Sequence, residues 1–289
     1  MKKTNNNNKT CFVLEGGALR GLYTAGILDA LYENNINIDC IIGVSAGALF
    51  GVNYFSCQPK RGFNYNLKYC NDKRYISVRS LLLTGNVVNK RFAYYKVSEK
   101  LFPFDQETFI KTNKPYYAVA TNIETGKPEY IKIEKPLDQM EALRATSAMP
   151  LLSRIVKYDG KKYLDGAVGD SVPVKKAMEL GYNKIVVVLT QPKEYRKEEL
   201  SEKQIKKVSK RYKKYPNFIE ASIKRPSEYN KTLENIDKLE EKKEIFVYRP
   251  KRSIDINPVK KTPKDLEDAY NLGYEDGINR LNDLKKFLK

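Results

Sequence analysis

The alternation of apolar and polar segments along the chain predicts repeated strand–helix units. Thr10 to Leu14 is a short apolar run suited to a buried parallel strand, and the residues from Leu22 to Glu33 have the spacing of an amphipathic helix. A second apolar run, Asp39 to Ile42, comes before a helix-compatible run from Ala46 to Tyr54. This series of strand, helix, strand and helix predicts an α/β fold with a parallel sheet and right-handed crossovers.

The middle of the chain continues this pattern and adds a hairpin. Lys184 to Thr190 is apolar on both faces, which predicts an interior strand. A two-residue Asp159-Gly160 turn joins two short strands, 155–158 and 161–164. Further strands and helices are predicted at residues 115–122 (strand), 129–133 (edge strand), 137–148 (helix) and 173–181 (helix).

Two regions differ in composition from the strand–helix units. Residues 58–114 interleave tyrosine, asparagine and basic residues, and we interpret them as an insertion that forms a cap over the site. Residues 191–289 predict a mostly helical C-terminal extension packed on the same domain, with a strand at 244–248 and one final amphipathic helix from Lys264 to Leu288. The main domain is then residues 10–190, and residues 1–9 are expected to be a disordered arm because an asparagine run follows the basic start.

The amino-acid composition limits the catalytic and metal-binding chemistry that the chain can perform. The chain has no histidine, so a Ser-His-Asp triad is impossible within it, and a zinc site is disfavoured because no Cys-x-x-Cys pair is present either. Four unpaired-looking cysteines, no signal peptide and no long apolar run favour a cytoplasmic protein, either free or peripheral at the inner membrane face. The net charge of +18 is spread along the chain and is consistent with a lysine-rich surface, anionic lipid or nucleic acid; nucleic acid ranks last because no reading motif accompanies the charge.

The stretch Gly43-Val44-Ser45-Ala46-Gly47 fits the G-x-S-x-G nucleophile elbow. A serine that attacks a carbonyl has to project from a tight strand-to-helix turn, and the flanking Gly43 and Gly47 let other backbone approach. The following helix N-terminus offers free N–H groups for negative charge. The alternative is a plain strand–helix turn in which Ser45 only caps the helix.

A glycine turn, Glu15-Gly16-Gly17-Ala18-Leu19-Arg20-Gly21, joins the first strand to the first helix. Such a turn presents backbone N–H groups to an anion. The spacing breaks the dinucleotide pattern, so an oxyanion of acyl transfer fits better, and a merely structural corner remains the alternative. Later, Asp165-Gly166 ends a predicted strand with a glycine beside it, which makes Asp165 a second candidate for the site.

Taken together, Glu15 to Gly21, Gly43 to Gly47 and Asp165-Gly166-Ala167 resemble the patatin-like phospholipase family over about residues 10–190, with an extension like that of a bacterial, cytosolic-type branch. The resemblance implies a three-layer α/β/α fold with a mostly parallel sheet and a Ser-Asp dyad. Ser45 would be the nucleophile and Asp165 its base or orienter, with no metal and no cofactor. The N–H groups of Gly16, Gly17 and Ala18 would form the oxyanion hole with Arg20 near it, supported by Gly21, Gly43, Gly47 and Gly166. Ala18 departs from the family, which usually has a third glycine there.

The resemblance implies a serine hydrolase of lipid acyl esters, of the phospholipase A, lysophospholipase or esterase type, that makes transient contact with an anionic membrane surface and binds no nucleic acid. One alternative is an acyltransferase that passes the acyl group to an alcohol or a lysolipid. Another is a catalytically weak regulatory or membrane-binding protein on the same fold, which Ala18 favours because alanine tolerates a positive φ poorly.

Overall fold

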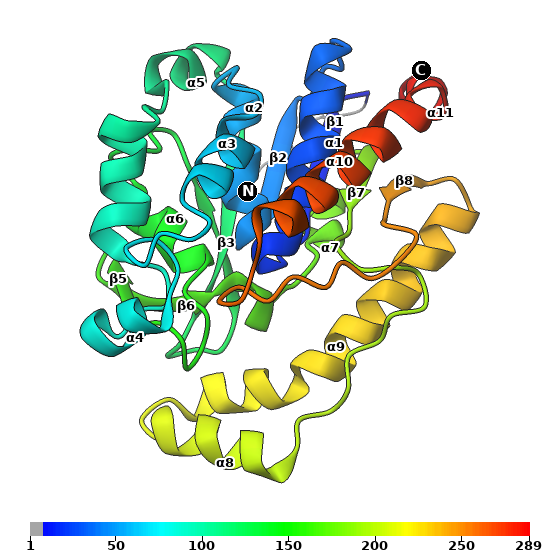
Figure 1. Cartoon of the computed structure of the whole chain (residues 1–289). Helices are drawn as coiled ribbons and strands as arrows, with labels where there is room; N and C mark the ends of the chain where they lie inside the picture. Colours follow the sequence, from blue (N-terminus) through cyan, green and yellow to red (C-terminus); the bar gives the residue numbers. More distant parts are fainter. Residues whose placement is uncertain (1–7) are drawn as a thin grey trace.

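Eight strands of residues 8–289, the residues that the computed structural model describes, form one mixed sheet (Figure 1). The strand order is β5-β6-β3-β2-β1-β7-β8, with β4 paired to β3 outside this path, and the run from β3 to β8 is parallel. Residues 1–7 of the predicted disordered arm lie outside the described residues. The strands are β1 (Thr10–Leu14), β2 (Cys40–Val44), β3 (Tyr116–Asn122), β4 (Pro128–Lys132), β5 (Val156–Tyr158), β6 (Lys161–Asp165), β7 (Lys184–Val188) and β8 (Ile245–Tyr248).

Alternating side chains of the parallel strands enter two separate cores. In β1, Phe12 and Leu14 point to one face of the sheet, while Cys11 and Val13 point to the other. The first face is covered by α1 (Gly21–Glu33), α2 (Ala46–Phe55) and α10 (Pro263–Asn279), and the second by α7 (Val174–Glu179) and α9 (Pro216–Glu241). This arrangement confirms the predicted three-layer α/β/α fold with a mostly parallel sheet and C-terminal helices.

The helix α1 is buried on nearly every side, which the prediction of an amphipathic helix missed. Every residue from Gly21 to Leu31 is buried because α10, from the far end of the chain, packs against the side that the sheet leaves open. A Cβ on Gly273 of α10 would overlap the backbone of Tyr23, and a Cβ on Gly26 would overlap the backbone of Tyr270. The two helices therefore cross with their backbones in contact, and this crossing fixes the C-terminal extension to the main domain.

We expect Gly273→Ala to lower the free energy of unfolding by about 2 kcal/mol, because the new methyl group forces α1 and α10 apart. Asn271→Ala, on the exposed side of the same helix, is the matched control and should change it by less than about 0.5 kcal/mol. Urea unfolding of both variants measures the difference. Equal stability of the two variants would contradict the close crossing.

The C-terminal extension contributes to the sheet as well as to both helical layers. Its strand β8, which the pattern at 244–248 predicts, pairs in parallel with β7. The prediction of one helix over residues 264–288 is wrong, because α10 ends at Asn279 and a separate helix α11 (Leu281–Leu288) follows Arg280. The Arg280 guanidinium donates to the Val247 carbonyl and lies 4.4 Å from the centre of the Phe246 ring, so this residue is tied to β8 at the break.

Residues 58–114 form four helices between α2 and β3 in the chain. They are α3 (Arg61–Lys68), α4 (Val78–Thr84), the π-helix η2 (Lys90–Leu101) and α5 (Gln106–Thr112). The remaining helices are α6 (Met140–Thr146), α8 (Glu202–Arg211) and the short 3-10 turns η1 (Ala18–Arg20) and η3 (Gly166–Val168). In residues 8–289, no helix is both long and apolar enough to cross a bilayer.

Candidate active site

The glycine turn and the serine elbow meet because they follow neighbouring parallel strands. β1 and β2 pair in register with Leu14 opposite Gly43, so both strands end at the same edge of the sheet. A Cβ on Gly16 would lie 2.9 Å from the Cβ of Ser45, and a Cβ on Gly47 would overlap the carbonyl groups of Leu14 and Glu15. The two loops therefore touch backbone to backbone, which only glycine at these positions permits.

Ser45 occupies a backbone conformation that non-glycine residues rarely adopt. Its φ is 52° and its ψ is −121°, between the end of β2 and the start of α2. A strained residue of this kind persists only where its surroundings hold it. Here the Ser45 N–H donates to the Thr146 hydroxyl at 2.8 Å, and Gly43 packs against the backbone of Ala48. The result is a serine whose hydroxyl projects from a tight turn, as a nucleophile elbow requires.

Asp165 is the direct partner of the Ser45 hydroxyl. The Ser45 Oγ donates to Asp165 Oδ2 at 2.7 Å, across 120 positions of sequence. The other carboxylate oxygen accepts the Ala167 N–H at 2.9 Å. Both residues are buried, and burial raises the pKa of the Asp165 carboxyl above its usual value, although the Ala167 N–H, the Ser45 hydroxyl and nearby Arg225 oppose the shift.

The hairpin that carries Asp165 reaches Ser45 through β3. The strand β6 runs antiparallel to β3 with Ala120 opposite Asp165, and β3 is the parallel neighbour of β2. Gly166 allows this pairing, since a Cβ there would overlap the carbonyl group of Val119. The other Asp-Gly pair of the hairpin, Asp159-Gly160, has φ values of 46° and 70° and forms the exposed turn, as its spacing predicts.

The glycine turn presents free backbone donors beside Ser45. Within residues 8–289, the N–H groups of Gly16 and Gly17 make no hydrogen bond, and Gly17 packs on Thr190. Ala18 lines the same pocket as Ser45. Its φ is +49°, so alanine occupies the left-handed region here in place of a glycine. Gly21, at the start of α1, packs against Ala46 and Phe50 of α2.

Because Ala18 has a positive φ, we expect Ala18→Gly to raise the free energy of unfolding by about 1 kcal/mol. Ala25→Gly, in the interior of α1, is the matched control and should lower it by about 1 kcal/mol. Thermal and urea unfolding of the two variants should therefore shift in opposite directions. A loss of stability in both variants would show that Ala18 carries no backbone strain.

Glu15, which no sequence pattern singled out, fixes the start of the glycine turn. Its carboxylate is buried and accepts the Thr190 N–H at 2.6 Å and the Tyr229 hydroxyl at 2.7 Å. The Lys197 ammonium lies 3.3 Å from the centre of the Tyr229 ring, and burial lowers the pKa of Lys197 to about 8. One carboxylate thus joins the ends of β1 and β7 to α9 of the extension.

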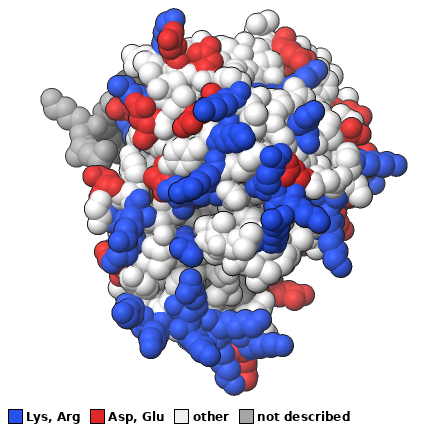
Figure 2. Space-filling view, turned by 60° about the vertical axis from the view of Figure 1, so that its left-hand side comes forward, with Lys and Arg blue, Asp and Glu red and all other residues white. Residues whose placement is uncertain are grey.

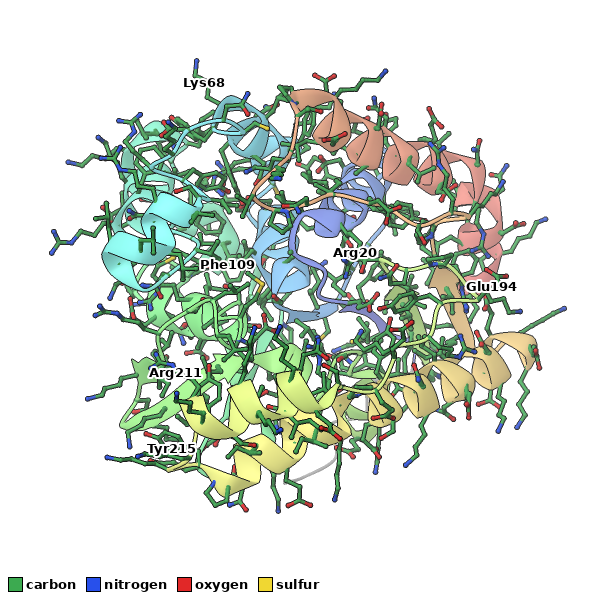
Figure 3. All side chains as sticks on the ribbon, turned by 60° about the horizontal axis from the view of Figure 1, so that its bottom comes forward. Arg20, Lys68, Phe109, Glu194, Arg211 and Tyr215 are labelled. Atoms are coloured by element: carbon green, nitrogen blue, oxygen red, sulfur yellow. The ribbon has the colours of Figure 1, made fainter. Side chains whose placement is uncertain are left out.

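The Arg20 side chain lies near Lys197 and Tyr229 and does not line the pocket at Ser45. It is close enough to lower the pKa of both Lys197 and Tyr229, and it is not among the residues that line the pocket at Ser45. Figure 3, which views the side of α8 and α9, shows Arg20 near the centre, beside the start of α1. The structure therefore brings Ser45, Asp165 and the turn from Gly16 to Ala18 together and places the Arg20 side chain next to them.

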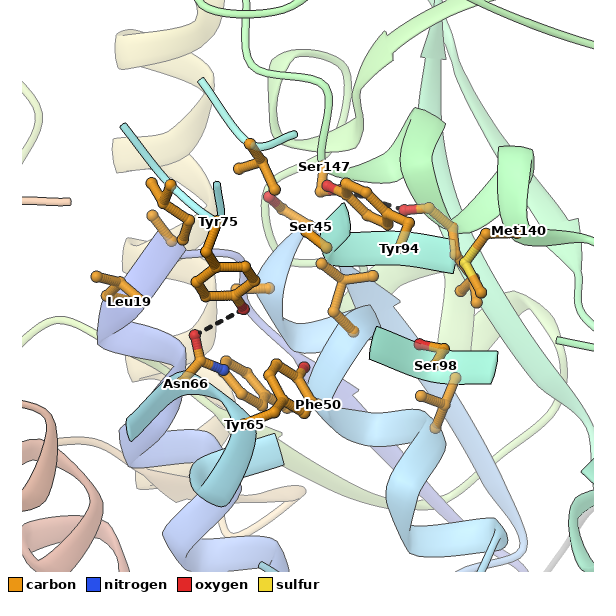
Figure 4. A pocket seen from close by; sticks show the side chains of 18 of the residues that line it. Leu19, Ser45, Phe50, Tyr65, Asn66, Tyr75, Tyr94, Ser98, Met140 and Ser147 are labelled. Atoms are coloured by element: carbon orange, nitrogen blue, oxygen red, sulfur yellow. Dashed lines mark hydrogen bonds between the residues drawn. The ribbon is translucent and has the colours of Figure 1, made fainter. Parts of the chain in front are cut away.

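An apolar pocket opens over Ser45 (Figure 4). The cavity holds about 120 Å³ and is lined by α2, the 58–114 insertion and α6. Two hydrogen bonds brace its polar groups: Tyr94 with Ser147 at 2.9 Å and the Tyr75 hydroxyl to Asn66 at 3.0 Å. Its apolar wall includes Phe50, Val52, Ile76, Val88, Met140 and Leu143. A pocket of this composition suits a hydrocarbon chain whose carbonyl end lies at Ser45.

One wall of the pocket is the π-helix η2, which the sequence pattern did not predict. It runs for 12 residues, although π-helices are usually single turns. Ala93 and Ser98, five residues apart, both line the pocket, as the i to i+5 repeat of a π-helix allows. Tyr94 reaches the same cavity (Figure 4).

Comparison with known protein families identifies the family to which this chain belongs. The model of the patatin-like phospholipase family matches residues 12–178, so the chain belongs to that family. A second model, of a domain of unknown function (DUF6363), matches residues 215–289 in the C-terminal extension.

Two relatives among the curated proteins cover part of the chain. The uncharacterized protein YjjU of Escherichia coli is 29% identical over 190 residues, which cover 64% of this chain and 52% of YjjU. The protein named "Probable lipid hydrolase 463L", of Invertebrate iridescent virus 6, is 28% identical over 185 residues, which cover 58% of this chain and 62% of that protein. The chain therefore spans less than two thirds of these relatives. Among solved structures, VipD from Legionella pneumophila overlays 95% of this chain and 67% of its own, with a TM-score of 0.48 and 14% identity.

Proposed function

We propose that the chain hydrolyses acyl esters of lipids through Ser45 and Asp165. The observation that carries the proposal is the 2.7 Å hydrogen bond from the hydroxyl of Ser45, which lines an apolar pocket, to the buried carboxylate of Asp165. Membership of a phospholipase family supports a lipid ester as the substrate. Contact with an anionic membrane surface belongs to the same proposal, because such substrates reside in membranes.

The first half of the reaction forms an acyl-enzyme. Ser45 Oγ attacks the ester carbonyl carbon while Asp165 Oδ2 accepts the hydroxyl proton. The carbonyl oxygen becomes an oxyanion, which the N–H groups of Gly16, Gly17 and Ala18 stabilise. The intermediate then collapses, the ester C–O bond breaks, and Asp165 returns the proton to the departing alcohol.

The second half releases the fatty acid. Water attacks the acyl-enzyme carbonyl while Asp165 takes a water proton, and the same N–H groups hold the second oxyanion. Collapse expels Ser45 Oγ, which recovers its proton from Asp165. An aspartate is a weak base for serine at its usual pKa of about 3.9, so the burial that raises the pKa of Asp165 favours this role.

The proposal is tested with a panel of lysophospholipids and simple acyl esters of increasing chain length. We expect release of free fatty acid by the wild-type chain, with kcat/KM rising with chain length until the apolar pocket is full. Parallel reactions with added glycerol or lysolipid distinguish hydrolysis from acyl transfer, since a transferase would form a new ester instead of the free acid. No turnover of any ester by folded protein would overturn the proposal.

A further inference from the structure

Three large apolar side chains are exposed on one small projection. This α4 projection comprises residues 77–87, and within it Leu82 is 81% exposed, Leu83 is 71% exposed and Val78 is 50% exposed. Leu151 and Leu152 of a neighbouring loop are also exposed, and the carbonyl group of Leu152 accepts the Val87 N–H at 2.8 Å. Exposed apolar groups gathered in this way mark an interaction surface.

Hydrogen bonds within the α4 projection hold its shape. The Ser77 hydroxyl caps α4 by accepting the Ser80 N–H at 2.9 Å, and the Ser80 hydroxyl donates to the Asn86 carbonyl at 2.8 Å. Gly85, with a φ of +73°, ends the helix, and the Ser77 N–H donates to the Val87 carbonyl at 3.0 Å to close the base. The leucines are thus held outward by a capped helix.

The base of the α4 projection is part of the pocket wall. Ile76 and Val88 form an antiparallel bridge immediately before and after the projection, and both line the apolar pocket over Ser45. Whatever the projection contacts therefore lies next to that pocket.

A basic groove of about 950 Å³ runs beside Leu83. Seven cations and one acid, Glu141, line it; two of the cations pair with Glu141, and Arg74 pairs with Asp72. The other four form no ion pair within residues 8–289: Arg91, Lys96, Arg154 and Lys157. Figure 2 shows this side of the molecule, where Lys and Arg side chains are more prominent than Asp and Glu.

We propose that the α4 projection inserts its leucines into the surface of an anionic lipid bilayer, while the basic groove binds the phosphate groups of the lipids. Apolar side chains next to unpaired cations match the layering of such a surface, where acyl chains lie beneath phosphate. A second copy of the chain fits poorly, because it would bring the same four cations and a net charge of +18 against one another. The docked orientation sets the acyl pocket at the lipid surface.

Docking is tested on the full chain carrying Ser45→Ala, so that no substrate is consumed. Sedimentation measures its binding to vesicles of phosphatidylcholine alone and with phosphatidylglycerol. We expect binding to the anionic vesicles that weakens with salt, and a loss of about tenfold or more in the partition coefficient for Leu82→Ser with Leu83→Ser. Removal of the four groove cations should lower the partition coefficient by at least as much. This variant carries Arg91→Gln, Lys96→Gln, Arg154→Gln and Lys157→Gln.

The matched control removes four exposed lysines at the end of α9 and in α11, elements that lie on the other side of the molecule from α4 in Figure 1: Lys238→Gln, Lys242→Gln, Lys285→Gln and Lys286→Gln. It changes the net charge equally and should retain most of the binding. The chain has no tryptophan, so Leu83→Trp introduces a single fluorophore. Its emission should shift to the blue on anionic vesicles and be quenched by brominated lipids, whereas Ile278→Trp on α10 should show neither effect.

Equal losses in the groove and control variants would overturn the inference, because binding would then depend on net charge alone. Unchanged emission of Leu83→Trp on bound vesicles would overturn it too, as would a dimer in solution that Leu82→Ser with Leu83→Ser dissolves. The inference would also be wrong if the Ser45→Ala chain did not bind anionic vesicles at all. The inference does not depend on turnover. A wild-type chain without esterase activity, together with a Ser45→Ala chain that docks as described, would reject the proposed ester hydrolysis and leave the docking intact.

Discussion

Ser45→Ala is expected to lower kcat/KM for acyl esters by about 10⁴-fold or more while leaving the fold intact. The substitution removes the hydroxyl oxygen that would form the acyl-enzyme, and loss of a serine nucleophile in a hydrolase typically has an effect of this size. The methyl side chain of alanine fits the space, so circular dichroism and thermal unfolding should show a folded protein. Turnover is measured as release of free fatty acid from a lysophospholipid.

Ser227→Ala, on α9, is the control for this variant, because its hydroxyl donates to the Lys224 carbonyl of the same helix, away from the Ser45 pocket. It should retain wild-type turnover. If purified Ser45→Ala kept more than a small fraction of the activity, the reaction would have to proceed through another group, and the proposed role of Ser45 would be wrong.

Asp165→Asn is expected to lower turnover by about 10³-fold or more, since an amide cannot accept the Ser45 proton. The same change should raise the free energy of unfolding at neutral pH. The asparagine side chain would keep a carbonyl oxygen for the Ala167 N–H and would remove a buried charge. Lost activity combined with gained stability is the pattern expected of a group held for chemistry at the expense of stability.

The pH dependence of that stability difference has a definite sign. The pKa of Asp165 is raised in the folded state, so the native protein binds this proton more tightly than the unfolded chain. The contribution of Asp165 to stability is therefore greatest in acid and is lost as the pH rises through the raised pKa. The advantage of Asp165→Asn over wild type should grow from about pH 4 upward and then level off.

Asp159→Asn provides the matched control, because Asp159 occupies the exposed turn of the same hairpin and asparagine accepts its positive φ. This variant should keep both turnover and stability. An Asp165→Asn protein as active as Asp159→Asn would show that Asp165 is not the base.

The residues at the centre of the candidate site could be predicted because their signals are local in sequence. The serine elbow and the turn at Gly16-Gly17 each come at the end of a parallel strand, and parallel strands deliver their carboxyl ends to one edge. Asp165 instead ends the antiparallel strand β6, where the glycine beside it is the local signal. Because the chain has no histidine, a Ser-His-Asp triad was excluded, and Asp165 became the candidate partner of Ser45. The predicted strands follow from apolar periodicity in the same way, whereas the three-layer arrangement was implied by the resemblance to the patatin-like phospholipase family.

What could not be predicted depends on contacts between distant segments. The Glu15–Tyr229 bond spans 214 positions, and nothing near either residue indicates it. The burial of α1 depends on α10 and its glycine crossing, so the local pattern correctly showed one apolar face but missed the second contact. The break at Arg280 likewise depends on β8, and the π-helix η2 has no periodicity signature that distinguishes it from an ordinary helix.

The central claim is that Ser45 is an activated nucleophile, and covalent labelling tests it most directly. A fluorophosphonate probe reacts with a serine whose proton is removed by a neighbouring base, without requiring the correct lipid substrate. Mass spectrometry of the labelled protein should find one adduct, on Ser45, that is absent from Ser45→Ala and strongly slowed in Asp165→Asn. A folded wild-type chain that stays unlabelled at Ser45, or that is labelled equally fast without Asp165, would contradict the account.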